Sequence, residues 1–225
     1  VDDLLRDAAI AFDEPRIFGA LLTQTAVSRA ARARAKVVLT GDGGDEAFSG
    51  YAWHTPPPAG RDPFAFVSEH TERVMPWFSA GDAATLLEPL RAPGESVYSE
   101  QIAVETLLPH DRPWLPGPRR AQRLDLLGFC ASTILPKVDR ASMAVGLEMR
   151  APLLDRRVIE WGLSRPPVEG EPPKAPLREF LRRRVPQRTL ERPKQGFSLR
   201  LGDPQVWLKH ADRLHAERSR RTHPP

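Results

Sequence analysis

The sequence predicts an α/β fold, because a helix, a strand and a glycine-rich acidic turn follow one another near its start. Residues 16–35 are rich in Ala, Leu and Arg and carry an apolar stripe, which is typical of an amphipathic helix. Residues 37–40 (Val-Val-Leu-Thr) are apolar or β-branched and predict a short buried strand. The turn at residues 41–46 (Gly-Asp-Gly-Gly-Asp-Glu) follows at once. Such a helix–strand–turn unit is typical of sheets flanked by helices.

The acidic turn has the residue types that bind a metal–phosphate complex. Glycines allow a left-handed backbone and close approach, so their N–H groups can cradle a phosphate. The carboxylates of Asp42, Asp45 and Glu46 would repel that phosphate unless Mg²⁺ lay between them. We therefore expect a Mg²⁺–polyphosphate corner at the carboxyl end of a strand, where α/β sheets bind ligands. The alternative is an acidic turn that leads into a helix capped by Asp45.

Composition excludes several classes of protein. The 225 residues are 40% hydrophobic and 28% charged, which indicates a soluble globular chain of one large or two small domains. No run approaches the ~18 apolar residues of a transmembrane helix, and the first residues lack the form of a signal peptide. Cys130 is the only cysteine, which excludes an internal disulfide and favours a cytoplasmic location.

The charge pattern argues against a nucleic-acid partner. The net charge is +4, but the two basic clusters, at residues 182–184 and 218–221, contain no interleaved aromatic side chains for stacking on bases. A solvated helix face and a basic tail explain these clusters better. The six histidines show no metal-ligand spacing. We therefore expect no nucleic acid and no membrane among the partners.

The rest of the chain predicts several helices joined by proline-rich connections. Helices are expected at residues 1–12, 64–77, 82–91, 119–134, 155–163 and 177–185. Pro136 is expected to end or kink the helix at 119–134. Loops are expected at 52–63 and 166–176. We expect one domain over residues 1–210 and a basic polar tail over residues 211–225.

Two further stretches place charged residues in loop-like or apolar surroundings. Lys137, Asp139, Glu148 and Arg150 lie among Val, Met, Ala and Leu, where charges are costly unless they are paired. For Glu148 and Arg150 an ion-pair network and a direct role are equally good interpretations. The loop at residues 192–197 (Arg-Pro-Lys-Gln-Gly-Phe) is either a cationic site for a pyrophosphate leaving group or an exposed basic turn.

Taken in order, these motifs resemble the synthetase domain of glutamine-hydrolysing asparagine synthetases. The resemblance rests on VVLTGDGGDEAFSGY at 37–51, ILPKVDRASMAVGLEMRAPLLD at 134–155 and RPKQGF at 192–197, with FDEP at 12–15 as weaker support. It covers most of residues 10–205 and is weakest at 52–120. It implies an ATP-pyrophosphatase fold, with a parallel sheet flanked by helices and a mostly helical C-terminal part.

The resemblance also implies a reaction: a carboxylate becomes an acyl-adenylate, pyrophosphate leaves, and an amine attacks to form an amide. ATP and Mg²⁺ would be the cofactors, with Asp45 as the metal ligand. Asp42 and Lys194 would be catalytic. The other implied contacts are substrate binding by Gly43, Lys137, Asp139 and Arg150, and ATP or pyrophosphate binding by Thr40, Gly41, Gly44, Asp45 and Lys194. The small-molecule substrates would be aspartate or another carboxylate, with ammonia or an amine, and a homodimer fits the family.

The chain departs from the family pattern at its start. The family's serine- and glycine-rich ATP loop and its N-terminal glutaminase domain have no counterpart here, so we expect a chain truncated at its N-terminus and inactive alone. Asparagine synthesis from aspartate with glutamine-derived ammonia is expected in the full-length protein. The alternatives are a β-lactam or lasso-peptide-type macrolactam synthetase on the same fold, or an inactive or regulatory fragment.

Overall fold

The computed structural model describes most of the central part of the chain. The described residues are 4, 7, 11–12, 19–54, 62–74, 106–165 and 170–193. The helix expected at 82–91, the tail at 211–225 and nearly all of the helix expected at 1–12 lie outside them. The chain divides into two compact units, Val1–Thr40 with Leu135–Ala151 and Glu191–Pro225, and Gly41–Ile134 with Pro152–Leu190.

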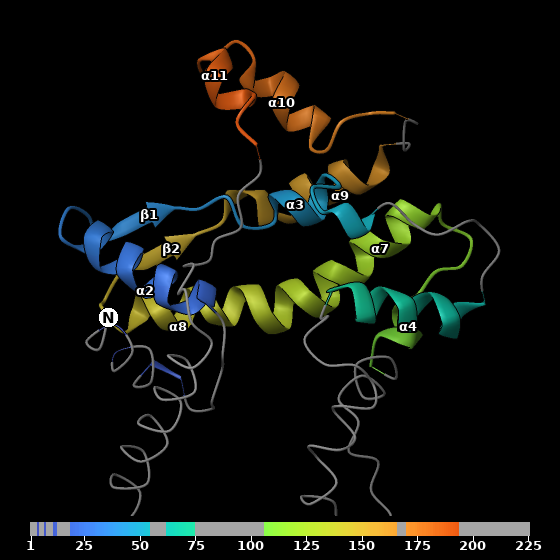
Figure 1. Cartoon of the computed structure of the whole chain (residues 1–225), viewed down its shortest axis with the longest axis horizontal. Coiled ribbons are helices and arrows are strands. Elements are labelled where there is room, and N and C mark those ends of the chain that lie inside the picture. Colours follow the sequence, from blue (N-terminus) through green and yellow to red (C-terminus); the bar gives the residue numbers. More distant parts are fainter. Residues whose placement is uncertain are drawn as a thin grey trace, which may run out of the picture. The chain divides into compact units, whose positions relative to one another are not determined.

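The first unit contains a small parallel sheet with two helices. Strand β1 (Val37–Leu39) pairs in parallel with β2 (Glu148–Arg150), and Val38 lies opposite Met149. Helix α2 (Gly19–Arg32) packs beside α8 (Leu135–Met143), as Figure 1 shows. Their contact buries the apolar core of this unit, which contains Phe12, Leu21, Leu22 and Ala141. The expected α/β character and the helix expected at residues 16–35 are confirmed.

The strand expected at residues 37–40 is confirmed as β1, but the expectation that it is buried is wrong. Val37 and Leu39 are 42% and 72% exposed, whereas Val38 between them is partly buried. On β2, Met149 accepts a hydrogen bond from Gln24 of α2 at 3.4 Å, while Glu148 and Arg150 are exposed. Successive side chains of a strand point to opposite faces. Helices therefore cover only the Val38–Met149 face among the described residues, and an apolar run alone cannot distinguish one covered face from two.

Within its described part, the regular elements of the second unit are all helices. Its elements are α3 (Gly44–Ala47), η1 (Ala52–His54), α4 (Pro63–Val74), η3 (Leu108–His110), α7 (Gly117–Asp125), η4 (Leu126–Ile134), η5 (Pro152–Leu154), α9 (Arg156–Ser164), α10 (Ala175–Leu181) and α11 (Gln187–Leu190). The apolar core joins α4 to α7 through Phe66, Val67, Leu107, Ala121 and Leu124. The helices expected near 64–77, 155–163 and 177–185 are confirmed.

Helical conformation continues through Pro136, so the alternative in which this proline ends the helix is wrong. The stretch predicted as one helix at 119–134 is α7 followed by a nine-residue π-helix, η4, and α8 begins at Leu135. Pro136 is the second residue of α8. The nine-residue π-helix directly before Pro136 departs from the α-helical hydrogen-bond pattern that a proline interrupts.

The surface loop expected at 52–63 is partly wrong as well. Residues 52–54 form the 3₁₀ helix η1, and His54 is buried. Pro63 begins α4, where Asp62 accepts a hydrogen bond from the N–H of Phe64 at 2.9 Å.

No helix in the described part of the chain is long and apolar enough to cross a membrane.

Candidate pyrophosphate corner

The acidic turn is built around one left-handed glycine. Gly43 has φ 87° and ψ −13°, and α3 begins at the next residue. The N–H of Ala47 donates to the Gly43 carbonyl at 2.9 Å. The helix is therefore capped by the Gly43 backbone, with no side-chain hydrogen bond, and the alternative in which Asp45 caps it is wrong. Asp45 lies within the helix, so its carboxylate remains available for other contacts.

Helix η5 packs closely against this turn. A methyl group on Gly43 would lie 2.3 Å from Cδ2 of Leu154, and one on Gly44 would lie 2.9 Å from Cδ1 of Leu153. Both glycines are buried, whereas Asp42 and Asp45 are partly exposed. Glycine at these positions thus permits the approach of η5 and leaves the two carboxylates accessible to solvent.

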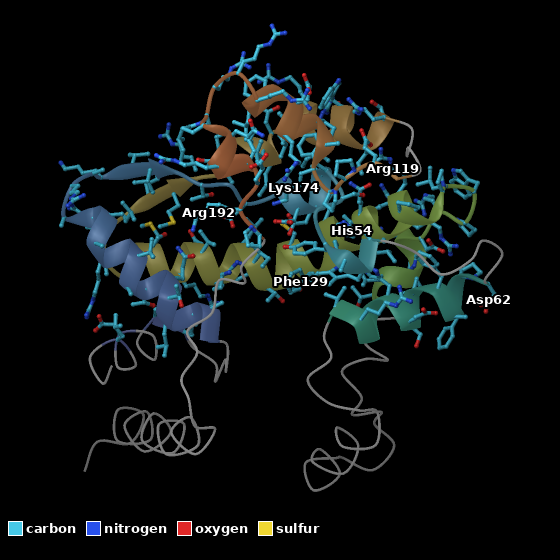
Figure 2. The ribbon with its side chains drawn as sticks, turned by 45° about the horizontal axis from the view of Figure 1, so that its top comes forward. His54, Asp62, Arg119, Phe129, Lys174 and Arg192 are labelled. Carbon is cyan, nitrogen blue, oxygen red and sulfur yellow. The ribbon has the colours of Figure 1, made fainter. Side chains whose placement is uncertain are left out.

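The carboxylate of Asp45 forms an ion pair with a lysine side chain. Its Oδ2 lies 2.7 Å from Nζ of Lys174, the residue that precedes α10 (Figure 2). The backbone N–H of Lys174 also donates to the Phe48 carbonyl at 3.0 Å. A methyl group on Gly50 would lie 2.1 Å from Oδ1 of Asp45 and 2.4 Å from Cε of Lys174, so the pair fits only because residue 50 has no side chain.

The neighbouring carboxylate, Glu46, faces inward. It is almost fully buried, and its Oε1 accepts a hydrogen bond from the Tyr51 hydroxyl at 2.9 Å. Burial raises the pKa of Glu46 above its ordinary value, and the nearby carboxylates of Asp45 and Asp125 add to the effect. Burial, together with the charge of Glu46, also raises the pKa of the Tyr51 hydroxyl. The side chain of Glu46 therefore stabilises the turn from the protein interior, whereas that of Asp45 lies on the solvent-accessible side of the turn.

A second buried carboxylate, Asp125, anchors the structure around α3. Asp125 is fully buried and accepts hydrogen bonds from Nε2 of His54 at 2.7 Å, Nε2 of His70 at 2.7 Å and Nε1 of Trp53 at 2.8 Å. Burial opposes ionisation of this carboxylate, but the bonds from His54 and His70 outweigh it and lower the pKa of Asp125. The cluster ties η1 and α4 to α7. We call Asp125, Trp53, His54 and His70 the Asp125 cluster.

Helix α7 reaches α3 through one more side chain. Nε2 of Gln122, which is fully buried, donates to the Glu46 carbonyl at 2.9 Å.

Cys130, in the π-helix that follows α7, is also buried, and burial raises the pKa of its thiol to about 12. A thiol that stays protonated at neutral pH is a poor nucleophile. Cys130 is therefore a core residue in this chain.

The other predicted substrate residues belong to the first unit. Lys137 is buried in α8, Asp139 is exposed on the same helix, and Nε of Arg150 lies 2.7 Å from Oε1 of Glu148. The side chains of Arg150 and Glu148 are 64% and 52% exposed. They form a surface ion pair rather than a buried network, because the face of β2 that carries them is open to solvent.

Three more predicted site residues remain: Thr40, Gly41 and Lys194. The N–H of Thr40 donates to the Arg150 carbonyl at 2.8 Å, but the buried Thr40 Oγ1 has no hydrogen-bond partner among the described residues. Lys194 lies outside the described residues. Arg192, in the same predicted loop, is exposed and is labelled in Figure 2. Gly41 is also exposed and has no atom within 4 Å of the position that a side chain would take.

Sequence reasoning missed Lys174 and the Asp125 cluster. Lys174 is one of few lysines in an arginine-rich chain, which is the signal that could have singled it out. His54, His70 and Asp125 come from three separate segments with no regular spacing, so no sequence pattern connects them.

The donor set around Asp45 fits Mg²⁺ only in the company of phosphate. Within the described part of the chain, no group of three or more His, Cys, Asp or Glu side chains could hold a metal ion. Mg²⁺ in phosphoryl-transfer sites keeps several waters and takes one or two carboxylates together with phosphate oxygens. Asp45 supplies one such carboxylate. It is partly exposed, and it already attracts the ammonium group of Lys174.

Comparisons with known proteins agree with the motifs. The family model described as asparagine synthase matches residues 1–224. A putative glutamine-hydrolysing asparagine synthetase of Mycobacterium bovis is 30% identical over 236 residues, which cover 90% of this chain and 35% of that protein. Asparagine synthetase 1 of Bacillus subtilis is 29% identical over 231 residues, 88% of this chain and 36% of that protein. No solved structure matches the chain.

The chain spans about a third of the length of these relatives. The family match, by contrast, extends over almost the whole chain. The chain therefore belongs to the asparagine synthase family.

Proposed function

We propose that this chain forms the pyrophosphate and substrate side of an ATP-dependent amide-forming site. In the complete protein the reaction is asparagine synthesis from aspartate and glutamine-derived ammonia, through an acyl-adenylate. The observation that carries the proposal is the position of Asp45. Its accessible carboxylate lies on the first turn of α3, two residues after the left-handed Gly43. It already pairs with a positive charge, the ammonium group of Lys174, at 2.7 Å. Membership of the asparagine synthase family supports the same reaction class.

The acidic turn provides the contacts to the nucleotide. Asp45 is the proposed Mg²⁺ ligand, and Mg²⁺, when bound, neutralises charge on the leaving pyrophosphate. Thr40, Gly41 and Gly44 are proposed to bind the phosphates. The unpartnered Oγ1 of Thr40 supports this role, because a buried hydroxyl without a partner carries a free-energy penalty that a ligand can remove.

The substrate side is assigned to Asp42 and Gly43. An amine that attacks an acyl-adenylate must lose a proton, and the partly exposed carboxylate of Asp42 is a suitable acceptor. Lys137, Asp139 and Arg150 are proposed to contact or support the acyl substrate. Lys194 is proposed to neutralise charge on the α-phosphate and the pyrophosphate during adenylate formation.

The test is ATP–pyrophosphate exchange with aspartate, measured for this chain and for the complete product of its gene. We expect exchange in the complete product and none in the chain alone. Lys194→Ala in the complete product should reduce exchange by roughly 10²-fold, the loss seen when one preorganised charge donor is removed. Arg188→Ala, an exposed charge on α11, is the matched control and should leave exchange unchanged.

Three results would contradict parts of the proposal. Exchange by the isolated chain would show that the missing ATP loop is not required. Normal exchange in Lys194→Ala with loss of amide formation would move Lys194 to the second half-reaction. Absence of exchange in the complete product with every carboxylate tried would refute adenylation itself.

A further inference from the structure

The short helix α3 depends on other segments for its hydrogen bonds. The last four carbonyls of a helix have no partner within it, and α3 has only four residues, Gly44–Ala47. Nε2 of Gln122, from α7, binds the Glu46 carbonyl at 2.9 Å. The N–H of Lys174 binds the Phe48 carbonyl, just after the helix, at 3.0 Å. The orientation of α3 is therefore set by its neighbours.

The side-chain amide of Gln122 can take only one orientation. It is fully buried, and its Oε1 accepts a hydrogen bond from Nη1 of Arg119, three residues earlier on α7 (Figure 2). A guanidinium group can only donate, and a backbone carbonyl can only accept. The amide oxygen must therefore face Arg119, and the amide nitrogen must face the Glu46 carbonyl.

Arg119 is itself held in place by the end of α9. Its Nη2 donates to the carbonyl of Arg165, the residue that follows this helix. Helix α9 also packs directly on α3, since a methyl group on Gly162 would lie 2.6 Å from the carbonyl oxygen of Ala47. Helices α7 and α9 are thus linked to each other, and both contact α3.

Glu46 is held at two points, one on its side chain and one on its backbone. Its Oε1 accepts from the Tyr51 hydroxyl at 2.9 Å, and its carbonyl accepts from Gln122. With both groups held, α3 cannot turn about its own axis without losing one of these bonds. The bond from Gln122 therefore restricts the direction of every side chain on this one-turn helix.

We infer that Gln122, oriented by Arg119, is a positioning residue for the acidic turn. It holds the carbonyl of Glu46 and thereby sets the direction of the carboxylate of Asp45, the preceding residue on the same helix. The inference rests on the proposed function, because it takes Asp45 as a contact to the metal–pyrophosphate complex. Displacement of such a contact by about 1 Å can slow a reaction by roughly 10²-fold, so the effect is measurable.

The experiment uses the complete product of the gene and has two readouts. Hydrogen exchange of peptides that cover residues 43–50 reports how firmly α3 is held, and ATP–pyrophosphate exchange with aspartate reports the reaction. Gln122→Met removes both amide contacts and keeps an unbranched side chain. Arg119→Met removes the donor that orients the amide, whereas Arg119→Lys keeps a donor there. Thr71→Val is the matched control, since it removes one buried bond, to the Val67 carbonyl at 2.9 Å, that lies within α4.

We expect Gln122→Met to speed hydrogen exchange at residues 43–50 by roughly two- to tenfold, the range for loss of one buried hydrogen bond. It should lower the maximal rate of ATP–pyrophosphate exchange by roughly 10- to 100-fold. The KM for aspartate should not change, because Asp45 is assigned to the pyrophosphate. Arg119→Met should show smaller losses of the same kind, and Arg119→Lys should restore most of the wild-type rate. Thr71→Val should lower the Tm and leave both readouts unchanged at temperatures well below it.

Unchanged hydrogen exchange at residues 43–50 in Gln122→Met overturns the inference, as does an unchanged maximal rate. An equal loss of rate in Thr71→Val also overturns it, since general destabilisation would then explain the effect. Should Gln122→Met not fold, the two Arg119 variants decide, and equal rates in both refute the orienting role of Arg119.

These results leave the proposed function standing as long as the wild type catalyses ATP–pyrophosphate exchange. Absence of that exchange in the wild type with every carboxylate would instead refute the proposed function, and the inference with it.

Discussion

The carboxylates around the acidic turn and the charged residues of strand β2 differ in burial. Around the acidic turn of the second unit, Glu46 and Asp125 are buried, and hydrogen bonds from Tyr51, Trp53 and two histidines satisfy them. In the first unit, Glu148 and Arg150 pair on the surface of β2. Burial fixes a charge in one geometry, because an unsatisfied buried charge is costly, whereas an exposed pair can rearrange in water. The acidic turn is therefore held in one geometry, whereas the exposed β2 pair can rearrange.

The Asp125 cluster gives the strongest test of this comparison. Asp125→Ala leaves the buried His54 and His70 and the partly buried Trp53 without an acceptor and should lower the free energy of unfolding by roughly 3–5 kcal/mol. Asp139→Ala, an exposed carboxylate of the first unit, should change it by about 0.5 kcal/mol or less. Denaturant unfolding of both variants measures the difference. Similar losses in the two variants would refute the proposed contrast between buried and exposed charges.

Glycine substitutions compare the same two regions at the level of the backbone. Gly43→Ala combines a positive φ of 87° with a contact of 2.3 Å to Leu154 and should destabilise by about 2–4 kcal/mol. Gly146→Ala has a similar φ of 68°, but its nearest atom lies 3.7 Å away, so only the backbone term of about 1–2 kcal/mol remains. Thermal unfolding should rank Gly43→Ala as the more damaging. If Gly146→Ala were the less stable variant, η5 would have to move away from residue 43 at little cost in free energy.

The pH dependence of the free energy of unfolding should reflect the raised pKa of Glu46. Its pKa is raised in the folded state, so the native chain holds its proton above the ordinary value of 4.5, and stability falls as the pH rises from 4.5 through the folded pKa. Glu46→Gln removes this decline and should be more stable than wild type at pH 7. Unfolding followed from pH 4 to pH 8, at about one-unit steps, checks this. Parallel curves for the two proteins would mean that Glu46 carries no such penalty.

The smallest effect is expected at the surface pair. Arg150→Ala removes an exposed partner of Glu148 and should change the free energy of unfolding by about 0–1 kcal/mol. In the complete protein, the same change should alter the KM for aspartate if Arg150 contacts the substrate as proposed. An unchanged KM would leave Arg150 as a surface residue only.

Local patterns predicted local structure well. The apolar stripe at 16–35 predicted the helix α2, and the helix predicted at 155–163 corresponds to α9. The exposure of Leu39 and the continuation of helix through Pro136 were not predictable, because each depends on neighbouring hydrogen bonds or on which faces are covered. The site motif was found from Gly43 and Asp45, but its partner Lys174 is 129 positions from Asp45 and no pattern connects them.

The sequence alone determined the family and the acidic turn, since glycines and carboxylates at fixed spacing restrict both backbone and ligand chemistry. Only the tertiary structure decided which carboxylates are buried and which remain accessible. Glu46 and Asp45 are adjacent and chemically alike, yet one accepts from Tyr51 inside the unit and the other meets Lys174 near its surface. That difference comes from helical geometry, which points successive side chains about 100° apart, and from the segments that pack on each side.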